Sequence, residues 1–181
     1  MNEKKLIIFV DVGDTIIDEG HEERKVPGGM VYHATCVPEA RETMLELYRR
    51  GYTIVMVADG LMQSFRNTMG ENGLDHIFAA WITSDVVGAE KPDRRMFEAA
   101  MERLGLTEED RSRIIMVGNN LSRDILGANR FGITSVHLYW SPRYPVRASR
   151  PEEEPKYRIK KPSELLPLVE KLEKQLEGVA G

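Results

Sequence analysis

Side chains that can do chemistry stand at four points of the chain, each just after a short apolar run or just before a proline. In chain order they are Asp11 with Gly13 and Thr15; Ala58, Asp59 and Gly60; Lys91; and Asn119 with Asn120 and Asp124. Lys91 precedes a proline that can start a helix, so its ammonium can lie near an anion bound there. Open α/β sheets bind ligands outside the carboxyl ends of their strands. We therefore expect these groups to line one site.

The segments between these points alternate between two patterns. Short runs rich in Ile and Val predict strands at Leu6–Val10, Thr53–Ala58, Ala80–Thr83, Ile114–Val117 and Thr134–Leu138. Amphipathic stretches predict helices at Glu39–Arg50, Leu61–Glu71, Asp93–Leu104 and Ser122–Phe131. Strands that alternate with helices form a mostly parallel sheet covered on both faces. The sequence therefore predicts an α/β fold, a Rossmann-like three-layer sandwich around a central, mostly parallel sheet.

The length of 181 residues suits one domain, residues 1–181. Residues 16–37 are expected to form a short flap loop. Residues 141–162 carry several prolines and predict a surface loop with a short strand near Tyr157–Ile159. A last helix is expected over residues 163–177, capped by Ser163, with Pro167 early enough in the helix to be tolerated.

The composition is that of an ordinary soluble globular protein, with 41% hydrophobic and 30% charged residues. The formal charge of −4 gives no general attraction for nucleic acid or an anionic membrane, so neither is expected as a partner. The apolar run LIIFV after MNEKK is shorter than the ~7–15 residues of a secretory signal, and no stretch approaches the ~20 apolar residues of a membrane span. A cytoplasmic location is expected. The single cysteine, Cys36, cannot form an internal disulfide.

In order and spacing, the four groups resemble the signature motifs of the haloacid dehalogenase-like superfamily, which consists mainly of magnesium-dependent phosphatases. The resemblance runs from Leu6 to about Leu138. Its most specific parts are GAEKPDRRMFEAAMERLG and the following VGNN, DILGAN and FGI. It implies a hydrolase that uses Mg²⁺ and acts on a small phosphorylated substrate.

The resemblance also implies a role for each residue. Asp11 would be the nucleophile that forms an aspartyl-phosphate, and Lys91 would neutralise charge on Asp11 and on the transferred group. The implied metal site consists of an Asp11 oxygen, the main-chain carbonyl of Gly13, Asn119 and Asp124, the last acting through water or by positioning Lys91. The positions implied around the phosphoryl group are Thr15, Ala58, Asp59, Gly60 and Lys91. Of these, Thr15 is expected chiefly to hold the loop.

Three positions depart from the phosphatase pattern. Gly13 replaces an aspartate that serves as general acid and base, worth roughly 10²–10⁴ in rate. Ala58 replaces a Ser or Thr that hydrogen-bonds the phosphoryl group, worth on the order of 10²–10³. Asn119 replaces a metal-binding aspartate. Two hypotheses stay open: a phosphatase that is weak or prefers good leaving groups, and a catalytically degenerate domain that binds phosphate-bearing ligands or a protein partner in a regulatory or structural role. A dehalogenase is a third interpretation, but the aromatic residue usual after its nucleophile is absent.

The flap of about two dozen residues is too short for a helical cap domain, and so is the stretch between Gly60 and Lys91. We expect an open cleft, which in the family suits a macromolecular substrate or a substrate that a neighbouring subunit or a protein partner covers. The carboxylate of Asp14 is expected to point away from the site. The four histidines, His21, His33, His76 and His137, show no metal-ligand spacing. A cluster of Arg143, Arg147 and Arg150 is expected to lie in a solvated loop, with contact to a phosphate-bearing ligand as the alternative.

Overall fold

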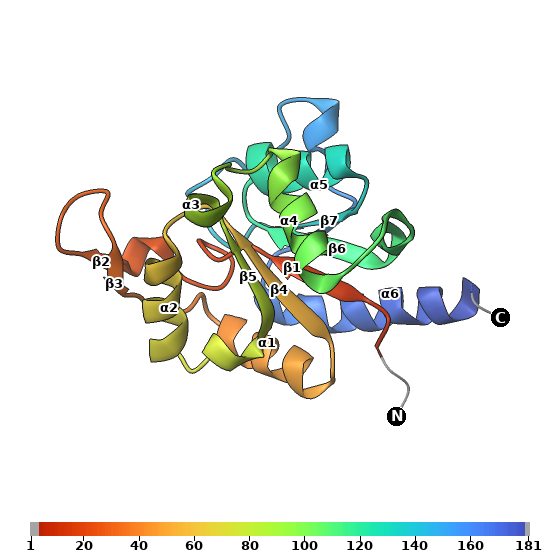
Figure 1. Ribbon diagram of the computed structural model, residues 1–181, viewed down its shortest axis with the longest axis horizontal. Helices are drawn as coiled ribbons and strands as arrows, with labels where there is room; N and C mark the ends of the chain where they lie inside the picture. The colour runs from red at the N-terminus through yellow and green to blue at the C-terminus, as the bar shows by residue number, and fades with distance from the viewer. Residues whose placement is uncertain (1–3, 180–181) are drawn as a thin grey trace.

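A computed structural model describes residues 4–179 of the chain (Figure 1). The strands are β1 (Ile7–Val10), β2 (Glu23–Arg24), β3 (Val31–His33), β4 (Thr53–Ala58), β5 (Phe78–Thr83), β6 (Ile114–Gly118), β7 (Thr134–Leu138) and β8 (Tyr157–Ile159). The helices are α1 (Ala40–Arg49), α2 (Met62–Glu71), α3 (Ser84–Val87), α4 (Arg94–Leu104), α5 (Leu126–Phe131) and α6 (Leu165–Val179). None of the helices in these residues is both long and apolar enough to cross a membrane.

The central sheet has six strands in the order β5-β4-β1-β6-β7-β8, and every neighbouring pair is parallel. Its strands are apolar at successive positions because both faces are covered. In β1, Ile8 and Val10 face a core built with α1, α2 and α6, while Ile7 and Phe9 face a second core built with α4 and α5. The predicted three-layer sandwich with a mostly parallel sheet is confirmed.

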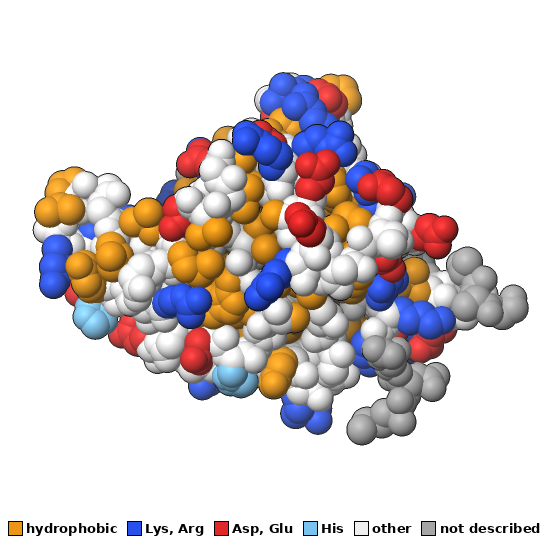
Figure 2. Space-filling model, viewed as in Figure 1, with side chains coloured by type: hydrophobic (Ala, Val, Ile, Leu, Met, Phe, Trp, Pro, Cys, Tyr) orange, Lys and Arg blue, Asp and Glu red, His pale blue; other side chains and the backbone are white. Residues whose placement is uncertain are grey.

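The flap is more ordered than a simple loop. Within residues 16–37, β2 and β3 pair in an antiparallel hairpin beside α2, at the left of Figure 1. Two hydrogen bonds fasten it: the Val31 N–H donates to Ser64 Oγ at 3.0 Å, and Asn67 Nδ2 donates to the Val31 carbonyl at 2.9 Å. Hydrophobic side chains gather at its tip, where Val26 is 61% exposed (Figure 2).

Two helical starts differ from the predictions. The stretch expected to be one helix from Ser122 begins with a π-helical turn, Leu121–Ile125, before α5. The side chain of Asn120 caps this turn by accepting from the Ser122 N–H at 3.1 Å. The last helix is preceded by a short 3₁₀ turn, Pro162–Glu164, and α6 starts at Leu165. The short strand expected in the proline-rich segment is β8, which pairs with β7.

Candidate active site

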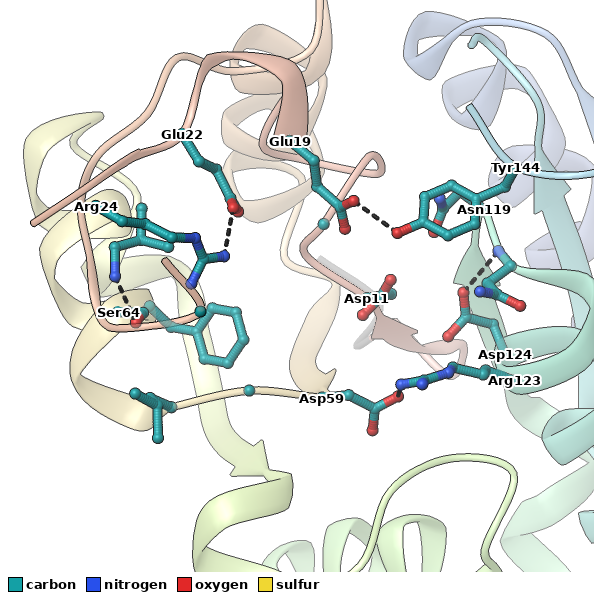
Figure 3. A pocket seen from close by; sticks show the side chains of 17 residues that line it. Asp11, Glu19, Glu22, Arg24, Asp59, Ser64, Asn119, Arg123, Asp124 and Tyr144 are labelled. Atoms are coloured by element: carbon teal, nitrogen blue, oxygen red, sulfur yellow. Dashed lines mark hydrogen bonds and ion pairs between the residues drawn. The ribbon is translucent and has the colours of Figure 1, made fainter. Parts of the chain in front are cut away.

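A pocket of about 400 Å³ lies at the carboxyl ends of β1, β4 and β6 (Figure 3). Because β4 lies on one side of β1 and β6 on the other, this edge is the switch point at which open α/β sheets bind ligands. The sequence-predicted residues that line the pocket are Asp11, Gly13, Asp59, Gly60, Asn119, Asn120 and Asp124. The structure therefore brings together residues from three of the four predicted groups in the pocket lining. The fourth group contributes Lys91, which lies beneath the floor of the pocket.

Lys91 is held by three acceptors. Its Nζ donates to Asp11 Oδ1 at 2.8 Å and to the carbonyl of Val57 at 2.7 Å, and it pairs with Asp124 Oδ1 at 2.7 Å. An ammonium has three N–H donors, so all of them are used. The Lys91 main-chain N–H donates to Asp59 Oδ1 at 2.9 Å. The lysine side chain is 1% exposed, so this arrangement fixes it below the pocket floor.

The cluster holds two carboxylates for one ammonium. Burial, together with the neighbouring charge of Asp124, raises the pKa of Asp11 to about 7, although Lys91 opposes the rise. Burial alone would lower the pKa of Lys91, but the charges of Asp11 and Asp124 outweigh it and hold that pKa above its ordinary value. The Lys91 ammonium therefore stays charged near neutral pH, and the raised pKa of Asp11 lies in the same range.

The position of Asp124 depends on Gly118, the last residue of β6. A Cβ added at Gly118 would overlap the carboxyl group of Asp124. The second oxygen of that carboxyl group accepts from the Asn120 N–H at 3.0 Å, and the first contacts Lys91. Both oxygens of Asp124 thus have partners, so this residue would act on a metal through water.

Three oxygen atoms of the site could together serve as ligands of Mg²⁺. Among residues 4–179, no hydrogen bond uses the second Asp11 oxygen, the Gly13 carbonyl or the side-chain amide of Asn119, and all three residues line the pocket. Oxygen ligands with one or two carboxylates, completed by water and substrate phosphate, are the set that Mg²⁺ uses. The described chain has no group of three or more His, Cys, Asp or Glu side chains placed to hold a metal. The site therefore suits Mg²⁺ but supplies it with little charge.

His137 holds the main chain of Asn119 in place. Its Nε2 lies 3.1 Å from the Asn119 carbonyl, and its Nδ1 lies 3.3 Å from Arg158 Nη1. Because a guanidinium can only donate, Nδ1 accepts and Nε2 carries the proton that bonds Asn119. Burial lowers the pKa of His137, so the ring stays neutral in this contact. His137 therefore positions the main chain of Asn119 through a hydrogen bond.

Two predicted phosphate-binding positions, Thr15 and Ala58, lie outside the pocket lining. The turn after β1, in which the N–H groups of Ile16 and Ile17 both donate to the Val12 carbonyl, carries Thr15 away from the cleft. Thr15 lines a small apolar cavity against α1 instead, and its buried hydroxyl has no partner among the described residues. Ala58 is fully buried. Of the predicted phosphate-binding residues, Asp59, Gly60 and Lys91 are therefore at the site.

The proline-rich segment after β7 docks against the turn after β1. Trp140 Nε1 donates to the Asp14 carbonyl at 2.7 Å, and Arg143 Nη1 donates to both carboxylate oxygens of Asp14. Arg143 also pairs with Asp18 at 3.4 Å. The Asp14 carboxylate points away from the pocket, as predicted. Arg143 stays exposed, as expected of a solvated loop, but its guanidinium also pairs with the carboxylate of the buried Asp14.

The flap adds a carboxylate to the pocket that the sequence did not predict. In Figure 3 the side chain of Glu19 reaches into the same cavity as Asp11, and Tyr144 donates to Glu19 Oε2 at 2.6 Å. A Cβ added at Gly13 would overlap Glu19 Oε1. Burial raises the pKa of Glu19, against the hydrogen bond from Tyr144, and the pKa of Tyr144 is raised by burial and by that same bond.

Two arginines stand on opposite walls of the pocket. Arg123, next to Asp124 in the chain, pairs with Asp59 at 3.2 Å and Glu90 at 3.5 Å. Arg24, on the flap hairpin, pairs with Glu22 at 2.6 Å. Both line the pocket and are partly exposed, and each is paired with a carboxylate at the rim. No sequence pattern pointed to Arg24, whose hairpin was expected to be part of a short flap loop.

This geometry agrees with what the sequence shares with known proteins. Residues 9–132 match the haloacid dehalogenase-like hydrolase family. The chain belongs to that family.

Individual relatives extend the match. A glyceraldehyde 3-phosphate phosphatase of Methanopyrus kandleri is 30% identical over 137 residues, which cover 76% of this chain and 58% of that protein. Another protein of that name, from Methanothermobacter thermautotrophicus, is 35% identical over 99 residues, covering 55% of this chain and 42% of that protein. The chain therefore spans about half the length of these relatives. The crystal structure of a HAD phosphatase from Thermococcus onnurineus has the same fold, with a TM-score of 0.72 at 20% identity, over 91% of this chain and 97% of that one.

Proposed function

We propose that the chain is a Mg²⁺-dependent phosphatase of small phosphorylated compounds that works through an aspartyl-phosphate on Asp11. The observation that carries the proposal is the Asp11–Lys91–Asp124 cluster at the floor of the pocket, in which the buried Lys91 uses all three of its N–H donors. Buried charges cost free energy unless they are paired, and a cluster of this kind is typical of a functional site. The phosphatases among the relatives support the same chemistry.

Each residue has a task in this proposal. The ionised Asp11 attacks phosphorus, while Lys91 lowers the repulsion between the carboxylate and the phosphoryl oxygens. The rim arginines, Arg24 and Arg123, would bond a substrate phosphate by exchanging their present carboxylate partners. Mg²⁺ would be held by Asp11, the Gly13 carbonyl and Asn119, with Asp124 reached through water, and when bound it neutralises charge on the phosphoryl group.

The pocket volume of about 400 Å³ is in the range of small-molecule sites. The flap hairpin forms one wall of the pocket through Glu22, Arg24, Gly28 and Val31. A neighbouring subunit or protein partner would therefore need to cover only the part of the cleft that the flap leaves open. That such a partner exists stays a prediction. A small phosphorylated compound fits this space, and a macromolecular substrate would have to present its phosphate past the flap.

The test is release of inorganic phosphate from a panel of aryl, sugar, nucleotide and acyl phosphates, with and without Mg²⁺. The variant Asp11→Asn keeps the shape of the side chain and removes the nucleophilic carboxylate, so it is the matched control. Release that needs Mg²⁺ and falls to background in Asp11→Asn is the expected result. If the wild-type protein releases no more phosphate than the variant from any compound, the chain is not a phosphatase, and binding of the same compounds would then test the degenerate-domain hypothesis.

A further inference from the structure

Phosphoryl transfer to Asp11 leaves two proton transfers to be explained. The leaving oxygen needs a proton, and the water that later attacks the aspartyl-phosphate must lose one. The residue two positions after Asp11 is Gly13, which has no side chain to do either. The group responsible must be another acid that reaches the pocket.

Most of the acids that line the pocket are already engaged. Asp124 has both oxygens bonded, Asp59 bonds the Lys91 N–H and Arg123, and Glu22 bonds Arg24. Glu19 differs from them. Tyr144 donates to its Oε2, but among residues 4–179 no hydrogen bond uses its Oε1. One oxygen of Glu19 is therefore held and the other is available for proton transfer.

That available oxygen lies beside the backbone of Gly13. A Cβ added at Gly13 would overlap Glu19 Oε1, so the flap carboxylate occupies the volume that a side chain at position 13 would fill. Figure 3 shows Glu19 and Asp11 entering one cavity from its two sides. A substrate phosphoryl group held on Asp11 would thus have Glu19 on the side facing the flap.

The position of Glu19 is fixed on three sides. Its main-chain N–H donates to Asp14 Oδ1 at 3.0 Å. The helical turn that it starts is capped by Asp18, which accepts from the Gly20 N–H at 2.9 Å. The third restraint is the hydroxyl of Tyr144 at 2.6 Å. Groups restrained in this way can hold the orientation that proton transfer needs.

We propose that Glu19 is the general acid and general base of this chain, supplied by the flap in place of a side chain at Gly13. The proposal rests on the phosphatase function proposed above. It assigns Glu19 a role that the sequence alone did not give it.

The two steps balance as follows. Asp11 attacks phosphorus, the bond from phosphorus to the leaving oxygen breaks, and that oxygen keeps the electron pair and takes the proton of Glu19. The Glu19 carboxylate then removes a proton from water as the water oxygen bonds to phosphorus. The bond between phosphorus and the Asp11 oxygen breaks, its electron pair returns to the carboxylate, and inorganic phosphate leaves with Glu19 protonated again.

The decisive variant is Glu19→Gln. Glutamine has the same shape and its carbonyl oxygen can accept from Tyr144, but it cannot transfer a proton. For alkyl phosphates, whose leaving groups need protonation, we expect kcat/KM to fall by roughly 10²–10⁴. For p-nitrophenyl phosphate, whose leaving group needs no acid, the first step should be nearly unaffected. Because water attack still needs the base, the variant should release a burst of p-nitrophenol and accumulate phosphorylated Asp11, visible by intact-protein mass spectrometry.

Two further variants separate proton transfer from structure. Tyr144→Phe removes only the restraint on Glu19 Oε2, so it should lower kcat/KM for alkyl phosphates more than for p-nitrophenyl phosphate, by a smaller factor than Glu19→Gln does. Glu19→Ala combined with Gly13→Asp should regain alkyl phosphate turnover relative to Glu19→Ala alone, because an aspartate at position 13 can enter the vacated volume. Urea unfolding of each variant checks that the fold is retained.

The outcomes are distinguishable. An equal loss on aryl and alkyl phosphates in Glu19→Gln, without a burst or a phosphorylated intermediate, would overturn the role of Glu19 and leave the phosphatase function standing. Phosphate release that does not depend on Asp11 in the wild-type protein would overturn both. A leaving-group-dependent loss together with the Gly13→Asp rescue is the result that the structure predicts.

Discussion

Replacing Lys91 with methionine is the sharpest test of the electrostatics of the cluster. Methionine is unbranched like lysine and fills much of the same space, but it has no ammonium. The variant removes the partner that Asp11, Asp124 and the Val57 carbonyl now have at 2.7–2.8 Å. The side chains of Lys91 and Asp124 are each 1% exposed, so water cannot take the place of the ammonium. Removing one member of a buried ion pair costs about 3–5 kcal/mol in the free energy of unfolding.

The cost of Lys91→Met should depend on pH. In the wild-type protein the pKa of Asp11 is about 7, and Lys91 is the group that lowers it, so that pKa rises in the variant. Between pH 7 and the higher pKa, the folded variant holds a proton that the folded wild type has lost. The free energy of unfolding of the variant therefore falls relative to the wild type as pH rises, by about 1.4 kcal/mol per pH unit.

Urea unfolding without Mg²⁺ at pH 6, 7 and 8, followed by the fluorescence of Trp81 and Trp140, measures this difference. The matched control is the double variant Asp11→Asn with Lys91→Met, compared with Asp11→Asn alone. It lacks the Asp11 carboxylate, so its deficit should change less over the same range than that of Lys91→Met alone. A deficit in Lys91→Met that is the same at all three pH values would refute the reasoning, because lost packing alone has no such pH dependence.

Three further predictions concern the residues around this cluster. Asn119→Asp adds a negative charge to a set of mostly neutral Mg²⁺ ligands. Because a unit charge beside the cation is worth more than ~1.4 kcal/mol at an effective dielectric of ~20, Mg²⁺ should bind at least ~10-fold more tightly in calorimetric titration. Unchanged affinity would show that Asn119 is not part of the metal site. Gly118→Ala should cost about 1–3 kcal/mol in urea unfolding, because its methyl group overlaps the Asp124 carboxyl group, and a cost under ~0.5 kcal/mol would contradict that contact. His137→Gln keeps a neutral donor at the Asn119 carbonyl but has no group that titrates. Because the pKa of His137 is lowered in the folded state, the wild type should lose stability relative to the variant as pH falls below the unfolded-state pKa of ~6.5, by up to about 1.4 kcal/mol per pH unit. If the free energies of unfolding of the two proteins change in parallel with pH, His137 is not held neutral.

The sheet was predictable because its strands are buried on both faces. The runs IIFV and TIVMVA carry no polar residue except the first threonine, and such runs can only be central strands or buried helix segments. The hairpin of β2 and β3 has the opposite character. Its strands are two and three residues long, and both residues of β2 are exposed. Its support comes from Ser64 and Asn67 on α2, so no local pattern could reveal it.

Some residues of the site were predictable from nearby strand patterns, and others were not. Asp11, Asn119 and Asp124 stand next to strands, so their meeting follows from parallel pairing of β1 with β6. Glu19 and Arg143 are placed by contacts that span more than a hundred residues of chain, from Tyr144 to Glu19 and from Arg143 to Asp14. A side chain in a loop carries no periodic signal of its partner. The flap carboxylate could therefore be found only in the folded structure.

The departures at Gly13 and Asn119 have different consequences. A side chain at position 13 and the observed position of Glu19 exclude each other, because a Cβ at Gly13 would overlap Glu19 Oε1. Glycine at this position therefore makes room for the flap carboxylate, and its presence does not by itself indicate lost proton transfer. Asn119 has no such counterpart, because the described residues contain no cluster of three acidic or imidazole side chains that could restore the missing charge. We therefore expect weak Mg²⁺ binding, and not the lack of a proton-transfer group, to limit the activity of this chain.

A domain that only bound ligands would gain nothing from a buried Lys91 with all three donors satisfied and a restrained acid facing Asp11, and this favours the enzyme over the degenerate domain.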